Sequence, residues 1–472
     1  MSGRRGRTGS RPGRSAWPLL VVAVGLLASA CSPAGAPTPA GSGTAGVSTR
    51  PAKVVVPPDT AAGAQLRWLL AATAHLPVSD GQVRARFDAA FLARVDAAVL
   101  NQWLQAVPGA QLLSIQVSEL NTIVAIVSAR AAAPTEVWLT VDGRGLISEL
   151  RVSPATTGPT PATWADVDAA LRSVAPQVRL LVADVSNGSC RTVHSIEPGT
   201  ATPIGAAFKL YVLAALGRAV ASGTVRWNQP LTVTAQLKSL PSGELQDEPD
   251  GTQISVQDTA AKMISVSDNT AANMLINLLG RPAVETALST TGMASPALDQ
   301  PFLTTREMFI LKLSQWPALA NRYIAANQAG RQALLAGTID PAPLPAVAAA
   351  QAWTTPRDIN SLEWFASADD ICRACTALAA LARRPGLSPI GQVLSINDGG
   401  LQLDPAQWKT TWFKGGSEPG VLTLAYLATT QTGHSYVVTV LAENPSHPIN
   451  QATAAPAMLS AVKAAFTLAL RR

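Results

Sequence analysis

Strand-like segments stand at both ends of a long, mostly helical stretch of this sequence. These apolar, β-branched runs lie at 178–185, 192–196, 410–414, 421–428 and 436–443. Helical patterns occur at 164–174 and 456–470, and a long helical region begins at Ala206. Strands must pair and bury one face, so the two groups predict one sheet built from both ends of the region, with helices packed around it.

The preceding segment, 61–155, has a different pattern. Apolar residues at helical spacing come first, followed by strand-like runs at 111–119, 122–130 and 136–151. The last run contains Asp142-Gly143, a strong signal for a hairpin turn. We therefore expect a small α+β domain over 61–155, a proline-rich joint at 154–161, and a second domain over 162–472.

The first residues resemble an export signal. Five arginines precede an uncharged apolar run at 17–30, which is shorter than the about 20 residues that span a membrane. The run ends in Leu-Ala-Ser-Ala before Cys31, which resembles a bacterial lipobox. We expect a signal peptide at 1–30, lipid attachment at Cys31, a flexible tether at 31–60, and a place on the outer face of the cell membrane. The alternative is an ordinary cleaved signal and a secreted protein.

Charge and cysteines limit the possible functions. The formal net charge of +6 includes the five signal arginines, which leaves +1 and gives no reason to expect a nucleic-acid partner. Beyond Cys31 the chain has Cys190, Cys372 and Cys375, which allow at most one disulfide and a free thiol. No second pair completes a metal site with Cys372 and Cys375, so we predict structural cysteines, no metal and no cofactor.

Three short motifs occur in order within the second predicted domain. They are Gly-Ala-Ala-Phe-Lys at 205–209, Ser-Asp-Asn at 267–269 and Lys-Gly-Gly-Ser at 414–417. Together they resemble the S-x-x-K, S-D-N and K-T-G motifs of class A β-lactamases and penicillin-binding proteins. The resemblance implies an antiparallel sheet flanked by helices, with an all-helical subdomain.

The first two motifs imply most of the catalytic roles in this family. Ala206 occupies the nucleophile position at the start of a helix, and Lys209 lies one turn later as the implied proton acceptor. Ser267 would relay protons to the leaving group, and Asn269 would bind a substrate amide. These roles follow from the resemblance.

The third motif implies a binding edge. Lys414 would supply positive charge for an anionic substrate, and Gly416 would let the strand backbone approach it. The N–H of Ser417 would complete the oxyanion hole, and its hydroxyl could bind a carboxylate.

Three departures from the family pattern bear on activity. Ala206 has no hydroxyl, so no acyl-enzyme can form at that position. No convincing glutamate for deacylation lies between the second and third motifs, because the nearest, Glu307, has the context of a helix start. The segment 314–353 resembles an insertion.

The two-part layout sharpens the resemblance. It is similar to a protein of the clavulanic-acid biosynthesis cluster and to actinobacterial lipoproteins, in which a steroid-isomerase-like (NTF2-like) domain precedes a β-lactamase-like one. The segments 413–421 and 361–365 are typical of that group.

Three functions remain open. The first is a pseudoenzyme that binds a β-lactam, a peptidoglycan peptide or an ester without being acylated. The second is an active β-lactam or ester hydrolase that uses Ser267 as nucleophile. The third is a scaffold lipoprotein that acts through its N-terminal domain.

Overall fold

The computed structural model describes residues 55–471, apart from 94, 106, 119–120, 129–133, 155–159 and 241. The predicted signal and Cys31 lie outside these residues, as does much of the predicted joint. Contacts group Val54–Arg472 into one compact unit. In the described part of the chain, no helix is both long and apolar enough to span a membrane.

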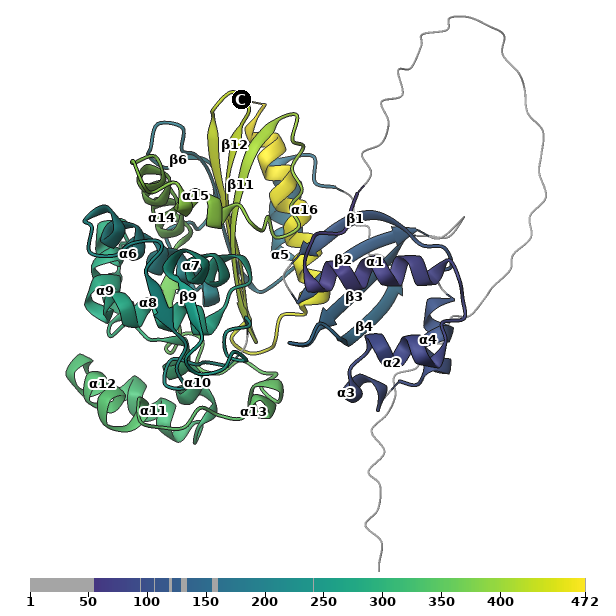
Figure 1. The fold of residues 1–472 in the computed structure, drawn as a ribbon. Coiled ribbons are helices and arrows are strands. Elements are labelled where there is room, and N and C mark those ends of the chain that lie inside the picture. Colours follow the sequence, from purple (N-terminus) through teal and green to yellow (C-terminus); the bar gives the residue numbers. More distant parts are fainter. Residues whose placement is uncertain are drawn as a thin grey trace, which may run out of the picture. The chain divides into compact units, whose positions relative to one another are not determined.

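The N-terminal part pairs helices with an antiparallel meander (Figure 1). The strands are β1 (Gln111–Ser118), β2 (Thr122–Ser128), β3 (Thr135–Val141) and β4 (Ile147–Pro154), and the helices are α1 (Ala61–Thr73), α2 (Asp80–Arg86), α3 (Ala89–Leu92) and α4 (Ala97–Leu104). The hairpin expected at Asp142-Gly143 joins β3 to β4. The helices α3 and α4 are separate because Asp88 and Asp96 each cap a new short helix. A separate apolar core spans Ala62 to Leu150.

The single sheet expected from both ends of the second region is present. Its order is β11-β12-β13-β5-β6, antiparallel throughout. The strands are β5 (Gln177–Asp184), β6 (Arg191–Ile196), β11 (Trp408–Glu418), β12 (Val421–Thr430) and β13 (Ser435–Glu443). β11 is an edge strand and runs past the expected 410–414, because it pairs with β12 as far as Glu418 and Val421. The tight turn between them uses Gly420 at φ +89°.

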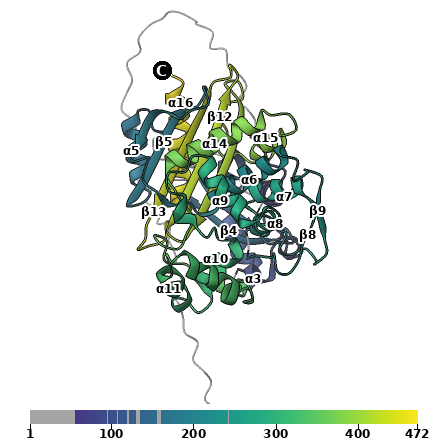
Figure 2. The ribbon, with the colours of Figure 1, turned by 90° about the vertical axis from the view of Figure 1, so that its left-hand side faces the viewer.

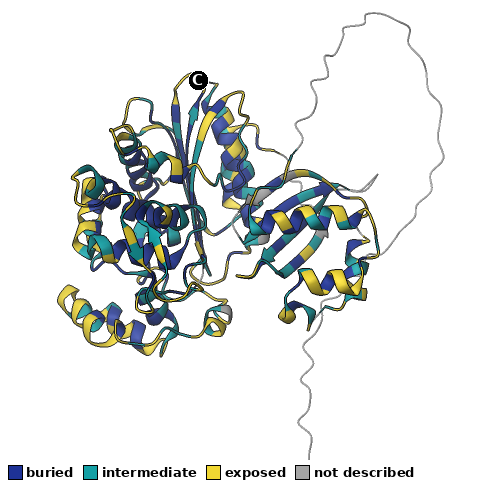
Figure 3. Ribbon diagram, in the orientation of Figure 1, coloured by how far each residue is buried: buried dark blue, intermediate teal, exposed yellow. Residues whose placement is uncertain are grey.

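Helices cover both faces of this sheet (Figures 1 and 2), and the sides that meet the strands are largely buried (Figure 3). One face packs against α5 (Trp164–Arg172) and α16 (Gln451–Ala469). α16 begins five residues before the expected Pro456, which lies inside it. The earlier turn forms because Asn450 O accepts from Ala454 N at 2.9 Å, and Ala454 and Ala455 are buried against the sheet.

The other face carries the helical middle of the chain and the larger core. Its helices are α6 (Lys209–Ala221), α7 (Val256–Ser265), α8 (Asn269–Leu279), α9 (Arg281–Thr290), α10 (Thr305–Leu313), α14 (Ala368–Ala382) and α15 (Pro389–Leu394). Short strands pair as β7 (Thr202–Pro203) with β10 (Phe365–Ala366) and β8 (Pro230–Thr232) with β9 (Gln253–Ser255). The insertion contains α11 (Ala318–Ala325), α12 (Gln328–Leu334) and α13 (Val347–Gln351).

One disulfide joins distant parts of this region. Cys190, just before β6, is bonded to Cys372 on α14, and Cys375 is a buried free thiol. The number of bridges agrees with the sequence prediction. Cys190 is half-buried, whereas Cys372 is fully buried.

Candidate functional site

Ala206 lies at the edge of a cavity of about 190 Å³. It belongs to a short 3₁₀ turn, Gly205–Phe208, and α6 begins only at Lys209. The helical region expected from Ala206 is present, but its first turn is 3₁₀ rather than α-helical. The turn is tighter because Gly205 adopts φ +51° and Ala207 N bonds to Ile204 O at 3.3 Å.

Strand β11 passes close to this turn. A Cβ atom on Gly416 would lie 2.7 Å from Ala206 N and 2.9 Å from Ala207 N, closer than real contacts allow. Gly416 therefore permits an approach that a larger residue would prevent. The close approach brings Ala206 and Ser417 to the same cavity wall.

Lys209 is fully buried behind this wall. Its Nζ donates to Ser267 O at 2.5 Å and Asn269 Oδ1 at 2.7 Å, and lies 3.1 Å from Ser267 Oγ. Burial, followed by the nearby Lys414 charge, holds the pKa of Lys209 well below 10.5. A neutral amine could keep both donor bonds and accept a proton from Ser267 Oγ, so the geometry suits a proton acceptor.

Ser267 lies between the two lysines, on the short link between α7 and α8. Its Oγ is 3.1 Å from Lys209 Nζ and accepts from Lys414 Nζ at 2.9 Å. The link is fixed by Asp268, which caps α8 and accepts two backbone N–H bonds from 244 and 245. Ser267 itself has φ +56°, an unfavourable conformation for a serine, which those contacts must hold in place.

Asn269 points inward. Its Oδ1 accepts from Lys209, and its Nδ2 donates to Leu240 O at 3.0 Å. Lys209 and Asn269 are absent from the cavity lining, whereas Ser267 and Lys414 are part of it. In this structure a ligand would therefore meet Ser267 and Lys414 directly and Lys209 only through Ser267.

The cavity carries positive charge. No aspartate or glutamate lines it, while Lys414 does, with its Nζ also donating to Gly415 O at 2.6 Å. Glu307 is not at this wall, because it caps α10 and pairs with Arg281 at 2.5 Å, in agreement with its helix-start context. Among the described residues, no group of three possible metal ligands was found.

Further lining residues were not singled out from the sequence. Ser242 Oγ donates to Ser267 O at 2.8 Å, and Asn397 Nδ2 donates to Ser265 O at 2.9 Å. Phe413 adds an apolar ring beside Lys414. Only the Asn-Asp-Gly-Gly turn at 397–400 gives a local sequence signal, and it predicts a loop rather than a site.

The chain matches two family models. Residues 162–362 match the beta-lactamase enzyme family, so this region has a β-lactamase-like α+β fold. Residues 57–147 match the model described as the ORF 12 gene product N-terminal. No curated protein sequence matches the chain.

The solved structures to which this chain is similar include two β-lactamases and PBP-A. A β-lactamase from Sphaerobacter thermophilus is 20% identical, covers 65% of this chain and 97% of its own, and has a TM-score of 0.46. One from Chitinophaga pinensis is 15% identical, with 65% and 98% coverage and a TM-score of 0.46. PBP-A is 16% identical, with 67% and 100% coverage and a TM-score of 0.45.

Proposed function

We propose that this protein binds an anionic carbonyl compound at the cell envelope without being acylated by it. A β-lactam, a peptidoglycan stem peptide and an ester all belong to that class. The observation that carries the proposal is the cavity beside Ala206, which presents Ser267 and Lys414 and no carboxylate. Such a wall favours a carboxylate and a carbonyl oxygen over a cation.

Hydrolysis at Ala206 fails for a chemical reason. Acyl transfer at this position needs an oxygen nucleophile on the 3₁₀ turn, and Ala206 offers a methyl group. Lys209, the implied base, keeps the contacts that would orient it. Of the groups needed for acylation, the proposal therefore requires only the nucleophile to be lost.

Two parts of the proposal concern the N-terminal region. Lipid attachment at Cys31 would hold the protein at the outer face of the membrane. The segment 61–155 would form a steroid-isomerase-like domain, and its helices followed by a four-stranded antiparallel meander support this part of the proposal. Metabolic labelling with a fatty-acid analogue tests the anchor, since Cys31→Ser should abolish the label.

Restoring the serine tests the central claim. Wild-type protein and Ala206→Ser are incubated with a fluorescent penicillin and examined by intact-mass analysis. The wild type should show a thermal shift and no covalent adduct, whereas the variant should gain one adduct per chain. Ala207→Ser, which adds a hydroxyl at the neighbouring buried alanine, should stay unmodified. A stoichiometric adduct on wild-type protein, or no binding at all, would overturn the proposal.

The contacts of Ser267 favour one second candidate, a hydrolase that uses this serine. Ser267 Oγ would attack the carbonyl carbon while its proton passes to Lys209 Nζ, and the leaving nitrogen or oxygen would take a proton from Lys414. Water would then cleave the Ser267 ester, giving one proton to the neutral Lys414, while Ser267 Oγ takes back its proton from Lys209. Turnover of a chromogenic cephalosporin or ester by wild-type protein, lost in Ser267→Ala and kept in Ser265→Ala, would support this candidate. No turnover would exclude it.

A further inference from the structure

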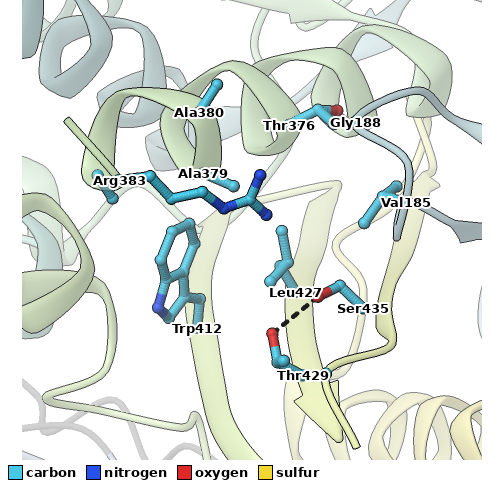
Figure 4. A pocket seen from close by; sticks show the side chains of 12 residues that line it. Val185, Gly188, Thr376, Ala379, Ala380, Arg383, Trp412, Leu427, Thr429 and Ser435 are labelled. Atoms are coloured by element: carbon cyan, nitrogen blue, oxygen red, sulfur yellow. Dashed lines mark hydrogen bonds between the residues drawn. The ribbon is translucent and has the colours of Figure 1, made fainter.

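A second cavity lies on the main sheet. Strand β11 contributes residues to both cavities, but to each cavity different ones. It has a volume of about 310 Å³, at the small end of typical ligand sites. Strands β11 to β13 form one side, α14 a second, and the turn between β5 and β6 a third (Figure 4). None of its lining residues lines the cavity beside Ala206.

The charged side chain that lines this cavity is Arg383. Arg383 extends from the end of α14 across the cavity, with its guanidinium over the space beside Trp412 (Figure 4). Within the described part of the chain, its side chain has no ion pair or hydrogen bond. No aspartate or glutamate lines the cavity, so Arg383 faces a space without a balancing charge.

The remaining lining suits a flat ring. Trp412 supplies an indole, Leu427 and Val185 are buried and apolar, and alanines of α14 leave the opposite side open. At the far end, Thr429 Oγ1 and Ser435 Oγ lie 2.9 Å apart and form a hydroxyl pair (Figure 4). An arginine at one end and hydroxyls at the other suit a ligand that is anionic at one end and polar at the other.

The walls of the cavity are joined covalently. Gly188 belongs to the turn, Thr376 belongs to α14, and the Cys190–Cys372 disulfide links these two segments. Cys190 Sγ lies 3.5 Å from Thr376 Oγ1. A site whose walls are fixed before binding loses less entropy when a ligand enters.

We propose that this cavity binds a planar aromatic carboxylate. Its carboxylate pairs with the Arg383 guanidinium, its ring lies against the Trp412 indole, and a polar substituent reaches the hydroxyls of Thr429 and Ser435. The site is independent of the function proposed for the cavity beside Ala206.

The test uses 4-hydroxybenzoate as probe on the full chain, followed by calorimetry or ligand-observed NMR. Arg383→Gln should weaken binding at least about tenfold, which is the loss of one charge-assisted pair. Arg384→Gln is the matched control, since Arg384 is the next residue and is exposed, as Arg383 is, but does not line the cavity. The neutral probe 4-hydroxybenzamide should bind the wild type as weakly as 4-hydroxybenzoate binds Arg383→Gln.

Two results would overturn the proposal. The first is no saturable binding of 4-hydroxybenzoate by the wild type at up to 10 times the about 1 mM dissociation constant expected for so small a ligand. The second is equal binding by Arg383→Gln and Arg384→Gln, which would show that the probe does not bind through Arg383. Equal melting temperatures of the two variants exclude a difference in folding.

Discussion

The buried amine of Lys209 makes the stability of the folded protein depend on pH. Burial and Lys414 lower its pKa in the folded state below 10.5. The unfolded chain keeps the ordinary pKa of 10.5. Between the lowered pKa of the folded chain and 10.5, the unfolded chain holds a proton that the folded chain has released, so stability rises with pH through that window. Below the folded pKa both states are protonated, and the full cost of burying the charge is present.

The Lys209→Met variant should therefore lose this pH dependence. Relative to the wild type, its free energy of unfolding should rise less steeply towards pH 10, with a difference in slope of up to about 1.4 kcal/mol per pH unit. Urea unfolding at a series of pH values measures both slopes. Lys463→Met, at an exposed lysine of α16, should keep the wild-type slope; a shared flattening would contradict the assignment to Lys209.

For single residues, the sequence predicts which side chains belong to the site better than it predicts the hydrogen bonds that they make. The motif order identified Ala206, Ser267 and Lys414, which the structure brings to one cavity. It did not reveal that Asn269 is held between Lys209 and Leu240 O. That contact depends on the path of the chain near 240, for which the motif contains no signal.

The packing of β11 against the 3₁₀ turn is the critical contact between elements. Gly416→Ala would place a Cβ against the backbone of Ala206 and Ala207. We expect a loss of about 1–3 kcal/mol in the free energy of unfolding and loss of the ligand-induced thermal shift, because the strand must move away from the turn. Gly337→Ala is the control, since a Cβ there meets nothing within 4 Å.

A buried ionic cluster joins α10 to the end of β11. Lys312 Nζ lies 2.5 Å from Glu418 Oε1 and 3.8 Å from Glu363 Oε1, and Lys312 is fully buried. Burial raises the pKa of Glu418 well above 4.5, and Lys312 opposes that rise. The lysine is therefore what makes two buried carboxylates tolerable.

Lys312→Met should cost about 3–5 kcal/mol in the free energy of unfolding, because it leaves buried carboxylates without a counter-charge. The double variant Lys312→Met with Glu418→Gln should recover part of that loss. Lys262→Met removes a half-exposed pair with Glu244, which solvent still screens, and should cost about 1 kcal/mol or less. Denaturant unfolding compares the three, and equal losses at 312 and 262 would contradict the argument.

Element types were easier to predict than element ends. The antiparallel sheet followed from apolar runs, but the 3₁₀ turn at 205–208 and the early start of α16 did not. Both depend on tertiary contacts: the close approach of β11 in one case and the packing of Ala454 and Ala455 in the other. The local sequence pattern carries no information about either of these contacts.

At the scale of the whole molecule, the Cys190–Cys372 disulfide closes a covalent loop with a sequence separation of 182. In the chain-entropy model a loop of that length contributes about 5 kcal/mol, and measured values are often smaller. The double variant Cys190→Ser with Cys372→Ser should therefore lose about 3–5 kcal/mol in urea unfolding. Cys375→Ala, which leaves the bridge intact, should lose less, and a reductant should destabilise only proteins that carry the bridge.

The pairing itself was not predictable. Three cysteines after Cys31 allow three single bridges, and spacing cannot choose among them. Cys372 and Cys375 lie one turn apart on α14, and only the packing of that helix decides which one meets Cys190.

The same disulfide determines whether the two fragments separate after a protease cuts the chain. The helices α11 to α13 lie between Cys190 and Cys372 in the chain, so a single cut there leaves two fragments joined by a covalent bond. One fragment would carry Ala206 and Ser267, and the other Lys414. A protein nicked in this segment outside the cell would therefore still hold both halves of its cavity together.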